Sequence, residues 1–437
     1  MKKIQLLSGF LTACLCALVF HIDAQNPKAK YGTFALTNAT IETVTKGTIK
    51  NGTVVISNGK IISVGENVSI PQGAETIDCR GQFIYPGMID GGTNLGLNEI
   101  GSDPRTQDFS EIGDIVPQMK ALTAVNPNAV PIPITRVSGV TTALTSPSGD
   151  LLSGTAALIN LHGYTPEQMY AGFEGVVLNF PHIGRRGFFD RRPDEEIKKA
   201  TEAAMKKLND AWERAIQYHK IDSATNGKGA GYYPEMQALL PVVRGTRAVL
   251  IEANTSKDIQ AALKWAKEKK ISKVVLTGVA EGWRVADEIA KAKVPVIAGG
   301  VLELPTREYD RYDQGYTNTA VLFKAGIKVA IRSNETSNQN YRNLPYHAGF
   351  AVAYGMDKLE ALKAITIVPA EIFGVADKLG SIEVGKSATL FVSTGDPFET
   401  KTQVKQVFID GWQMPMVSRQ TQLYDEFLKR EPGLNKK

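Results

Sequence analysis

The feature that most constrains the fold is a series of eight short apolar runs between residues 83 and 335. Each run is nearly continuous in Val, Ile, Leu and Ala, which is typical of strands buried on both faces of a parallel sheet. The runs are 83–90, 139–147, 154–163, 175–182, 247–254, 273–282, 294–300 and 328–335. Amphipathic segments at 193–220, 256–270 and 281–293 predict helices between them. Eight strands alternating with helices predict a (β/α)₈ TIM barrel. An open doubly wound sheet is the alternative, but the chain has no glycine-rich dinucleotide fingerprint to favour it.

Short strands and turns flank this region on both sides. Residues 31–79 alternate apolar and polar positions, and Ser-Asn-Gly-Lys at 57–60 is typical of a hairpin turn because Asn-Gly tolerates positive φ. The segments 380–398 and 404–414 have the same texture. We therefore predict a composite β-sandwich from residues 25–82 and 375–430, a barrel from 83–374, and a disordered tail at 431–437.

The first 24 residues have the pattern of a signal peptide. Lys2 and Lys3 precede a short apolar stretch at 6–20, and Ala24 offers a small residue for cleavage. We expect export to the periplasm or the medium. Lipid attachment at Cys14, in Leu-Thr-Ala-Cys, is the alternative, and the apolar stretch is short for a membrane span. Only Cys79 would remain after cleavage, which excludes an internal disulfide and a cysteine metal site.

The charge of the chain excludes one class of function. The 437 residues carry a formal charge of +5, without a concentrated basic segment, so nothing indicates a nucleic-acid partner.

Three segments resemble a known family. They are Asn-Gly-Lys-Ile-Ile-Ser-Val-Gly at 58–65, Phe-Ile-Tyr-Pro-Gly-Met-Ile-Asp at 83–90, and the long segment 360–392. They are similar to the first sandwich hairpin, the first barrel strand and the C-terminal signature of the amidohydrolase superfamily, in particular of its imidazolonepropionase-like members. The resemblance covers nearly the whole mature chain. It implies hydrolysis of C–N bonds in cyclic amides or small peptides, with one or two divalent metals, usually zinc, at the barrel mouth.

The resemblance also implies a set of metal ligands, and the matching positions of this chain differ from it. The family places His-x-His on the first strand, Lys or Glu on the fourth, His on the fifth and sixth, and Asp on the eighth. Here the corresponding or neighbouring residues are Gly92, Asn94, Asn179, Glu252, Asn254, Glu281 and Asn334. Glycine supplies no ligand, and an amide oxygen is a weak ligand for zinc. We therefore predict no metal cofactor, although zinc or another divalent ion is the family expectation.

Several other residues are candidates for a site at the mouth. Asp90 is either a site acid or a structural acid that binds backbone groups. His162 and His182 follow the third and fourth runs, and with Glu252 or Glu335 they would form a compensating site. Glu252, Glu281, Glu303 and Glu335 would supply acid–base chemistry as paired carboxylates. The structural alternative for these glutamates is pairing with Arg284, Arg307, Arg332 and Arg342. The catalytic candidates are thus Asp90, Glu252, Asn334 and Glu335.

Three hypotheses follow from these residues. The favoured one is a degenerate amidohydrolase, with weak or lost metal-dependent activity, that serves as a binding partner or subunit of an active homologue. The second is an active hydrolase with an unorthodox site. The third is a protein that binds a small ligand in the barrel mouth. Assembly into a homo-oligomer is a further expectation from the family.

Overall fold

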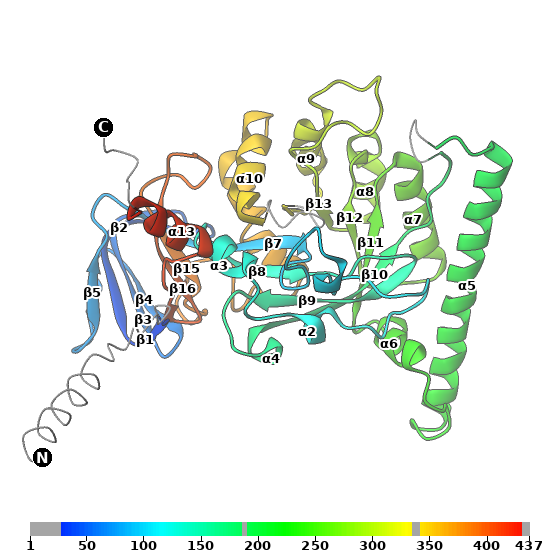
Figure 1. Ribbon diagram of the computed structural model, residues 1–437, viewed down its shortest axis with the longest axis horizontal. Coiled ribbons are helices and arrows are strands. Elements are labelled where there is room, and N and C mark those ends of the chain that lie inside the picture. Colours follow the sequence, from blue (N-terminus) through cyan, green and yellow to red (C-terminus); the bar gives the residue numbers. More distant parts are fainter. Residues whose placement is uncertain (1–27, 186–189, 334–340, 431–437) are drawn as a thin grey trace, which may run out of the picture.

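The computed structural model describes residues 28–185, 190–333 and 341–430 (Figure 1). The predicted signal peptide, Cys14, the tail 431–437 and the candidates Asn334 and Glu335 lie outside the described residues. A strand-rich part containing both described ends of the chain lies at one end of the molecule, and the barrel with its helices forms the rest (Figure 1).

The strand-rich part is built from both ends of the chain. Its strands run in the order β1-β17-β16-β15-β6-β2-β3-β4, with β5 paired to β2. They are β1 (Lys30–Tyr31), β2 (Phe34–Glu42), β3 (Thr48–Ser57), β4 (Lys60–Gly65), β5 (Glu75–Asp78), β6 (Phe83–Pro86), β15 (Leu390–Ser393), β16 (Val404–Ile409) and β17 (Trp412–Gln413). The predicted hairpin is confirmed, since Asn58 and Gly59 adopt positive φ between β3 and β4.

The barrel is an eight-stranded sheet in sequence order. Its strands are β7 (Met88–Thr93), β8 (Val140–Thr145), β9 (Leu152–Asn160), β10 (Tyr170–Asn179), β11 (Ala248–Ala253), β12 (Val274–Gly278), β13 (Val296–Ala298) and β14 (Val329–Ile331). The last strand returns beside the first: a Cβ on Gly91 of β7 would lie 3.2 Å from the carbonyl oxygen of Ile331 in β14. The predicted TIM barrel is therefore confirmed as a nearly closed sheet.

Two details of that prediction are wrong. First, β9 runs antiparallel to both β8 and β10. The connection 146–151 is too short for a crossover, which needs a dozen or more residues between parallel strands, so the chain turns back as a hairpin. Second, the run 83–90 is divided at Gly87 between β6 of one sheet and β7 of the other. Gly87 permits this passage because a Cβ there would lie 2.1 Å from Oγ1 of Thr141.

The three helices predicted between the strands are confirmed. They are α5 (Asp194–Ala224), α7 (Ser256–Glu268) and α8 (Ala286–Ala292). The others are α2 (Ala121–Ala124), α3 (Pro131–Arg136), α4 (Pro166–Met169), α6 (Pro234–Val243), α9 (Gln314–Lys324), α10 (Leu344–Ala353), α11 (Lys358–Lys363), α12 (Ile367–Ile372) and α13 (Arg419–Leu428), with short 3₁₀ turns η1 (Pro104–Thr106), η2 (Gly282–Arg284) and η3 (Tyr341–Asn343). Trp212 of α5 and Trp265 of α7 are buried and meet edge to face at 5.8 Å, which fixes these helices together over β10 and β11.

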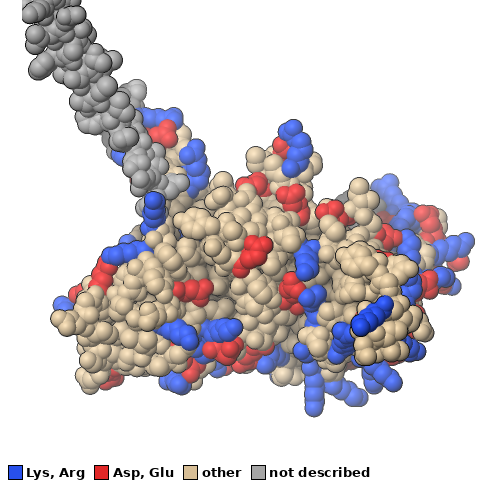
Figure 2. Space-filling view, turned by 90° about the horizontal axis from the view of Figure 1, so that it is seen from below, with Lys and Arg blue, Asp and Glu red and all other residues tan. Residues whose placement is uncertain are grey.

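The surface mixes charges of both signs. On the face shown in Figure 2, scattered groups of Lys and Arg side chains lie among scattered Asp and Glu side chains, and uncharged residues cover the area between them. Within the described ranges, no helix is both long and apolar enough to cross a bilayer.

Candidate functional site

The carboxyl ends of the parallel barrel strands meet at one end of the barrel, and this mouth collects most of the predicted site residues. Asp90 and Gly92 lie within β7, Asn179 ends β10, Glu252 lies near the end of β11, and Arg332 follows β14. Since barrel enzymes build their sites at this end, we describe each side chain here by what it contacts.

A buried ion pair crosses the mouth. The guanidinium of Arg332 donates from Nη1 to Oε2 of Glu252 at 2.9 Å and from Nη2 to Oε1 at 3.0 Å. Oε2 also accepts from Oγ1 of Thr277 at 2.6 Å, and Oε1 accepts from Nδ2 of Asn254 at 2.8 Å. Burial alone would raise the pKa of Glu252, but the Arg332 charge and these donors hold it below its ordinary value. Glu252 is therefore an anion with both oxygens occupied.

Glycines make room for this ion pair. A Cβ on Gly299 would lie 2.6 Å from Nε of Arg332, and one on Gly92 would lie 3.1 Å from its Cδ. A Cβ on Gly278, whose φ is +79°, would lie 2.3 Å from Oε1 of Glu252. Gly92 thus stands where the resemblance implies a histidine, and the space of that side chain is crossed by Arg332.

Asp90 is fully buried and binds backbone. Its Oδ1 accepts from the N–H groups of Gly92 at 3.2 Å and Ser333 at 3.1 Å, and its Oδ2 accepts from the Ser333 hydroxyl. Burial raises the pKa of Asp90 to about 6, and the hydrogen bonds from Ser333 oppose this. These contacts tie the end of β7 to the end of β14, which is a structural role.

The two asparagines of the mouth are also engaged. The hydroxyl of Tyr341, at the start of η3, donates to Oδ1 of Asn94, and both side chains are buried. Nδ2 of Asn179 donates to the carbonyl oxygens of Asp150 at 2.8 Å and Gly149 at 3.1 Å. Each amide therefore holds a loop beside the mouth.

Glu281 is buried after β12 and pairs with an arginine, as the structural alternative predicts. Its Oε2 accepts from Nη2 of Arg307 at 2.7 Å and from the Ser256 N–H at 2.9 Å. Its burial opposes ionisation, but the hydrogen bonds, led by those of Arg307, lower the pKa of Glu281 to about 2. The pair joins the loop after β13 to the start of α7, so Glu281 holds no proton to deliver near neutral pH.

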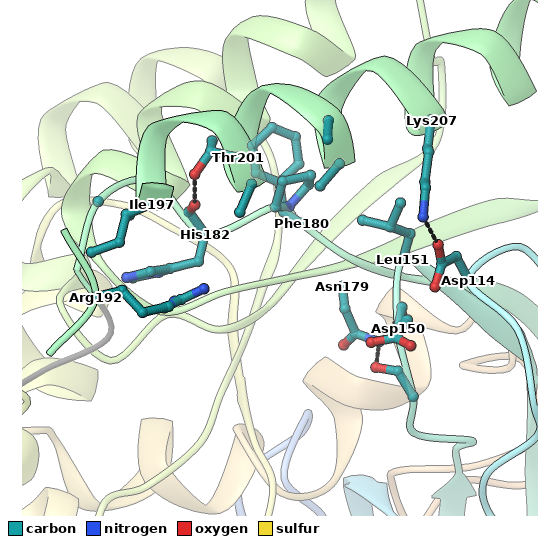
Figure 3. A pocket seen from close by; sticks show the side chains of 16 residues that line it. Asp114, Asp150, Leu151, Asn179, Phe180, His182, Arg192, Ile197, Thr201 and Lys207 are labelled. Atoms are coloured by element: carbon teal, nitrogen blue, oxygen red, sulfur yellow. Dashed lines mark hydrogen bonds and ion pairs between the residues drawn. The ribbon is translucent and has the colours of Figure 1, made fainter. Parts of the chain in front are cut away.

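His182 lies outside the mouth, beside α5. Nδ1 of His182 is 2.7 Å from Oδ2 of Asp258 in α7, and Nε2 is 3.1 Å from the carbonyl oxygen of Arg185. Both ring nitrogens therefore face an oxygen of α7 or of the loop before α5, and neither faces Glu252. Figure 3 shows His182, Thr201 and Lys207 around the adjoining cavity, of about 380 Å³.

His162 is at the opposite end of the barrel, so the prediction that placed it at the mouth is wrong. It follows β9, and because β9 is antiparallel, its carboxyl end points away from the mouth. The ring of His162 packs on Trp412 of β17 at 5.4 Å. The structure thus brings neither histidine to Glu252.

Little space remains between the described side chains of the mouth. Gly91, Gly92, Asn179, Glu252 and Arg332 help to line a cavity of about 10 Å³, enough for roughly one water. In the part of the chain that the structure describes, no three His, Cys, Asp or Glu side chains are grouped to hold a metal ion.

Sequence analysis missed the residues that occupy this space. Arg332 was a candidate ion-pair partner only, and Thr277, Gly299, Ser333 and Tyr341 were not singled out. The sequence contains one signal, and it concerns Arg332. A glycine, Gly92, stands where the resemblance implies a ligand, and a cation follows the last barrel strand directly.

Comparisons with known proteins agree with this architecture. Residues 246–414 match the family model described as "Amidohydrolase family". The chain is 24% identical over 384 residues to the imidazolonepropionase of Mesorhizobium japonicum, covering 79% of this chain and 87% of that protein. It is 22% identical over 403 residues to amidohydrolase tasK of Hapsidospora irregularis, covering 82% of this chain but only 39% of tasK. A solved amidohydrolase of Thermotoga maritima superposes with a TM-score of 0.76 at 25% identity, covering 87% of this chain and 99% of that one.

Proposed function

Since this chain belongs to the amidohydrolase superfamily and is imidazolonepropionase-like, we propose that it is an exported member in which metal-dependent C–N bond hydrolysis is weak or lost. In its place the protein acts by binding, most simply as a partner or subunit of an active homologue. The predicted signal peptide supports export, and the residues of the barrel mouth support the loss of hydrolysis.

The observation that carries this proposal is the buried pair of Arg332 and Glu252. A divalent ion needs ligands with free lone pairs around an unoccupied position. Here Glu252 accepts four hydrogen bonds, and a guanidinium lies in the position that Gly92 leaves open. A metal ion at this place would also be repelled by the Arg332 charge. The described donor set therefore does not fit zinc.

Zinc loading tests this proposal. The purified protein is incubated with zinc, passed through a desalting column and analysed by mass spectrometry of the metal. We expect far less than one zinc per chain, and the same for Glu252→Gln and for the exposed control Glu268→Gln. Zinc that stays at one per chain in the wild type and in Glu268→Gln would overturn the proposal, and its loss in a folded Glu252→Gln variant would place the ion at the mouth.

Retained hydrolysis is the second candidate, favoured by the relatives that carry the name imidazolonepropionase. A panel of hydantoin-like cyclic amides, lactams and dipeptides separates the two. Turnover that disappears with Glu252→Gln, while this variant still shows the circular dichroism spectrum of the folded wild type and the control keeps its turnover, would favour this candidate. Co-purification of a homologous amidohydrolase from the native source, without turnover by this chain alone, would favour the subunit role.

A further inference from the structure

A separate cavity, of about 420 Å³, lies at the end of the barrel opposite the mouth. It lies between α3, the residues that follow β9, and the segment that leads from β17 into α13. Figure 1 shows α3 and α13 near one another, between the barrel and the strand-rich part. The walls of the cavity are largely apolar and include Val130, Ile132, Leu161, Met169, Met414 and Val417. A volume of this size is in the range of small-molecule sites.

A partly buried guanidinium, that of Arg136, faces this cavity. Arg136, the last residue of α3, lines it and donates from Nη1 to the carbonyl oxygen of Leu161 at 2.9 Å. Its Nε is buried and has no hydrogen-bond partner, and no ion pair joins Arg136 to an acid among the described residues. Burial lowers the pKa of Arg136 to about 10, so the side chain is still a cation at neutral pH. A charge withdrawn from water in this way is costly unless an anion accompanies it.

The other ionisable groups of the cavity do not supply that anion. Lys28 and Arg419 line it and are exposed cations. Burial, and after it the charge of Arg136, lowers the pKa of His162, so the ring is neutral at neutral pH. The charge of Asp410, in the strand-rich part, opposes this lowering of the His162 pKa. Asp410 itself accepts from Nδ2 of Asn160 at 2.8 Å and from the Ser387 hydroxyl. The cavity is therefore apolar, positively charged and short of a counter-charge within the described chain.

We propose that this cavity binds a small carboxylate with an apolar body. The carboxylate accepts from the Arg136 guanidinium, and the body packs on Ile132, Met414 and Val417. The Arg136 guanidinium suits a planar monoanion because Lys28 and Arg419 are exposed to solvent, and the apolar walls favour a carbon chain over inorganic phosphate. This site is separate from the barrel mouth and does not depend on the function proposed for it.

Isothermal titration with three probes tests the proposal: 4-methylpentanoate, its neutral amide 4-methylpentanamide, and acetate. We expect 4-methylpentanoate to bind at least about tenfold more tightly than the amide, which lacks the charge. We also expect it to bind at least about tenfold more tightly than acetate, because each buried methylene strengthens binding roughly fourfold. No heat with 4-methylpentanoate up to about 10 mM, or equal affinity for all three probes, would overturn the proposal.

Variants assign the binding to this cavity. Arg136→Met should remove most of the preference for the carboxylate over the amide, and Val417→Trp should weaken binding of both by filling the cavity without touching the charge. Arg105→Met, which removes an exposed arginine at 88% side-chain exposure, is the matched control and should leave binding unchanged. Binding that survives both cavity variants would place the ligand elsewhere and refute the assignment. If Arg136→Met does not fold, Val417→Trp still decides the question.

Discussion

Replacing Glu252 with Gln should destabilise the fold far more than the same change in a surface ion pair. Each oxygen of the Glu252 carboxylate accepts two hydrogen bonds. Oε2 accepts from Thr277 and from Nη1 of Arg332, while Oε1 accepts from Asn254 and from Nη2 of Arg332. A glutamine has one oxygen and one NH₂ group. Whichever way the amide is turned, its NH₂ group faces an N–H group of Arg332, so the change loses a hydrogen bond as well as the charge.

The magnitude follows from the burial of the pair. The side chains of Arg332 and Glu252 are only 10% and 17% exposed, so solvent screens little of the interaction. Removing one member of a buried pair costs about 3–5 kcal/mol of unfolding free energy. In contrast, Asp103 and Arg105 form a bidentate pair whose arginine is 88% exposed, and Asp103→Asn should cost less than about 1 kcal/mol.

Urea denaturation of a double-mutant cycle measures this difference. Glu252→Gln, Arg332→Met and their combination are compared with the wild type, and the double variant should recover about 2 kcal/mol or more of the summed single costs. Such recovery is expected because the double variant leaves no uncompensated charge in the mouth. Additive single costs, or a cost for Glu252→Gln no larger than for Asp103→Asn, would refute the reasoning.

Three further predictions concern buried groups elsewhere. Because the pKa of Asp90 is raised from 3.8 to about 6, the native state binds more protons than the unfolded state in that window, and the wild type loses stability as pH rises through it. Asp90→Asn should therefore gain stability relative to the wild type by up to about 3 kcal/mol across this window in pH-dependent urea denaturation; a constant difference would contradict the sign. His347 behaves oppositely: burial lowers its pKa from 6.5 to about 4, so the wild type loses about 3 kcal/mol as pH falls between those values. His347→Leu should flatten that acid loss in thermal unfolding, and an unchanged slope would contradict it. Gly299→Ala places a Cβ 2.6 Å from Nε of Arg332, so it should lower the melting temperature by several degrees, whereas Gly32→Ala, with its nearest contact at 3.6 Å, should change it little. Equal effects of the two substitutions would show that Arg332 moves freely.

The barrel and the composite sheet were predictable because local patterns encode them. Near-continuous Val and Ile runs mark strands buried on both faces, and Asn58-Gly59 marks a hairpin whatever surrounds it. The direction of a strand was not predictable in this way, because an apolar run does not indicate whether its strand is parallel or antiparallel to its neighbours. The direction of β9 follows from the length of the connection 146–151, and only that length indicated a return instead of a crossover.

For the site, the sequence showed only which positions differ from the metal ligands that the family resemblance implies. Gly92 and Asn94, for example, indicated that this chain lacks the two histidines of the first strand. They did not indicate what fills the space, because Arg332 and Glu252 are 80 residues apart and their pairing is a property of the closed sheet. The misplacement of His162 has the same origin, since its end of the barrel depends on the direction of β9.

The glycines of the mouth and its ion pair form one interdependent arrangement. Any side chain at position 92 would press on Cδ of Arg332 at 3.1 Å, so a metal-binding histidine there requires that Arg332 move or be lost. Loss of Arg332 leaves Glu252 buried with two neutral donors instead of a cation, which is unfavourable until a new cation arrives. Conversely, a cation cannot be gained while Arg332 remains. Replacing Gly92 alone is therefore disfavoured by Arg332, and replacing Arg332 alone is disfavoured by the buried charge of Glu252. Restoring a metal site requires Gly92 and Arg332 to be replaced together. A Gly92→His variant that binds zinc with Arg332 still present would show that this interdependence is wrong.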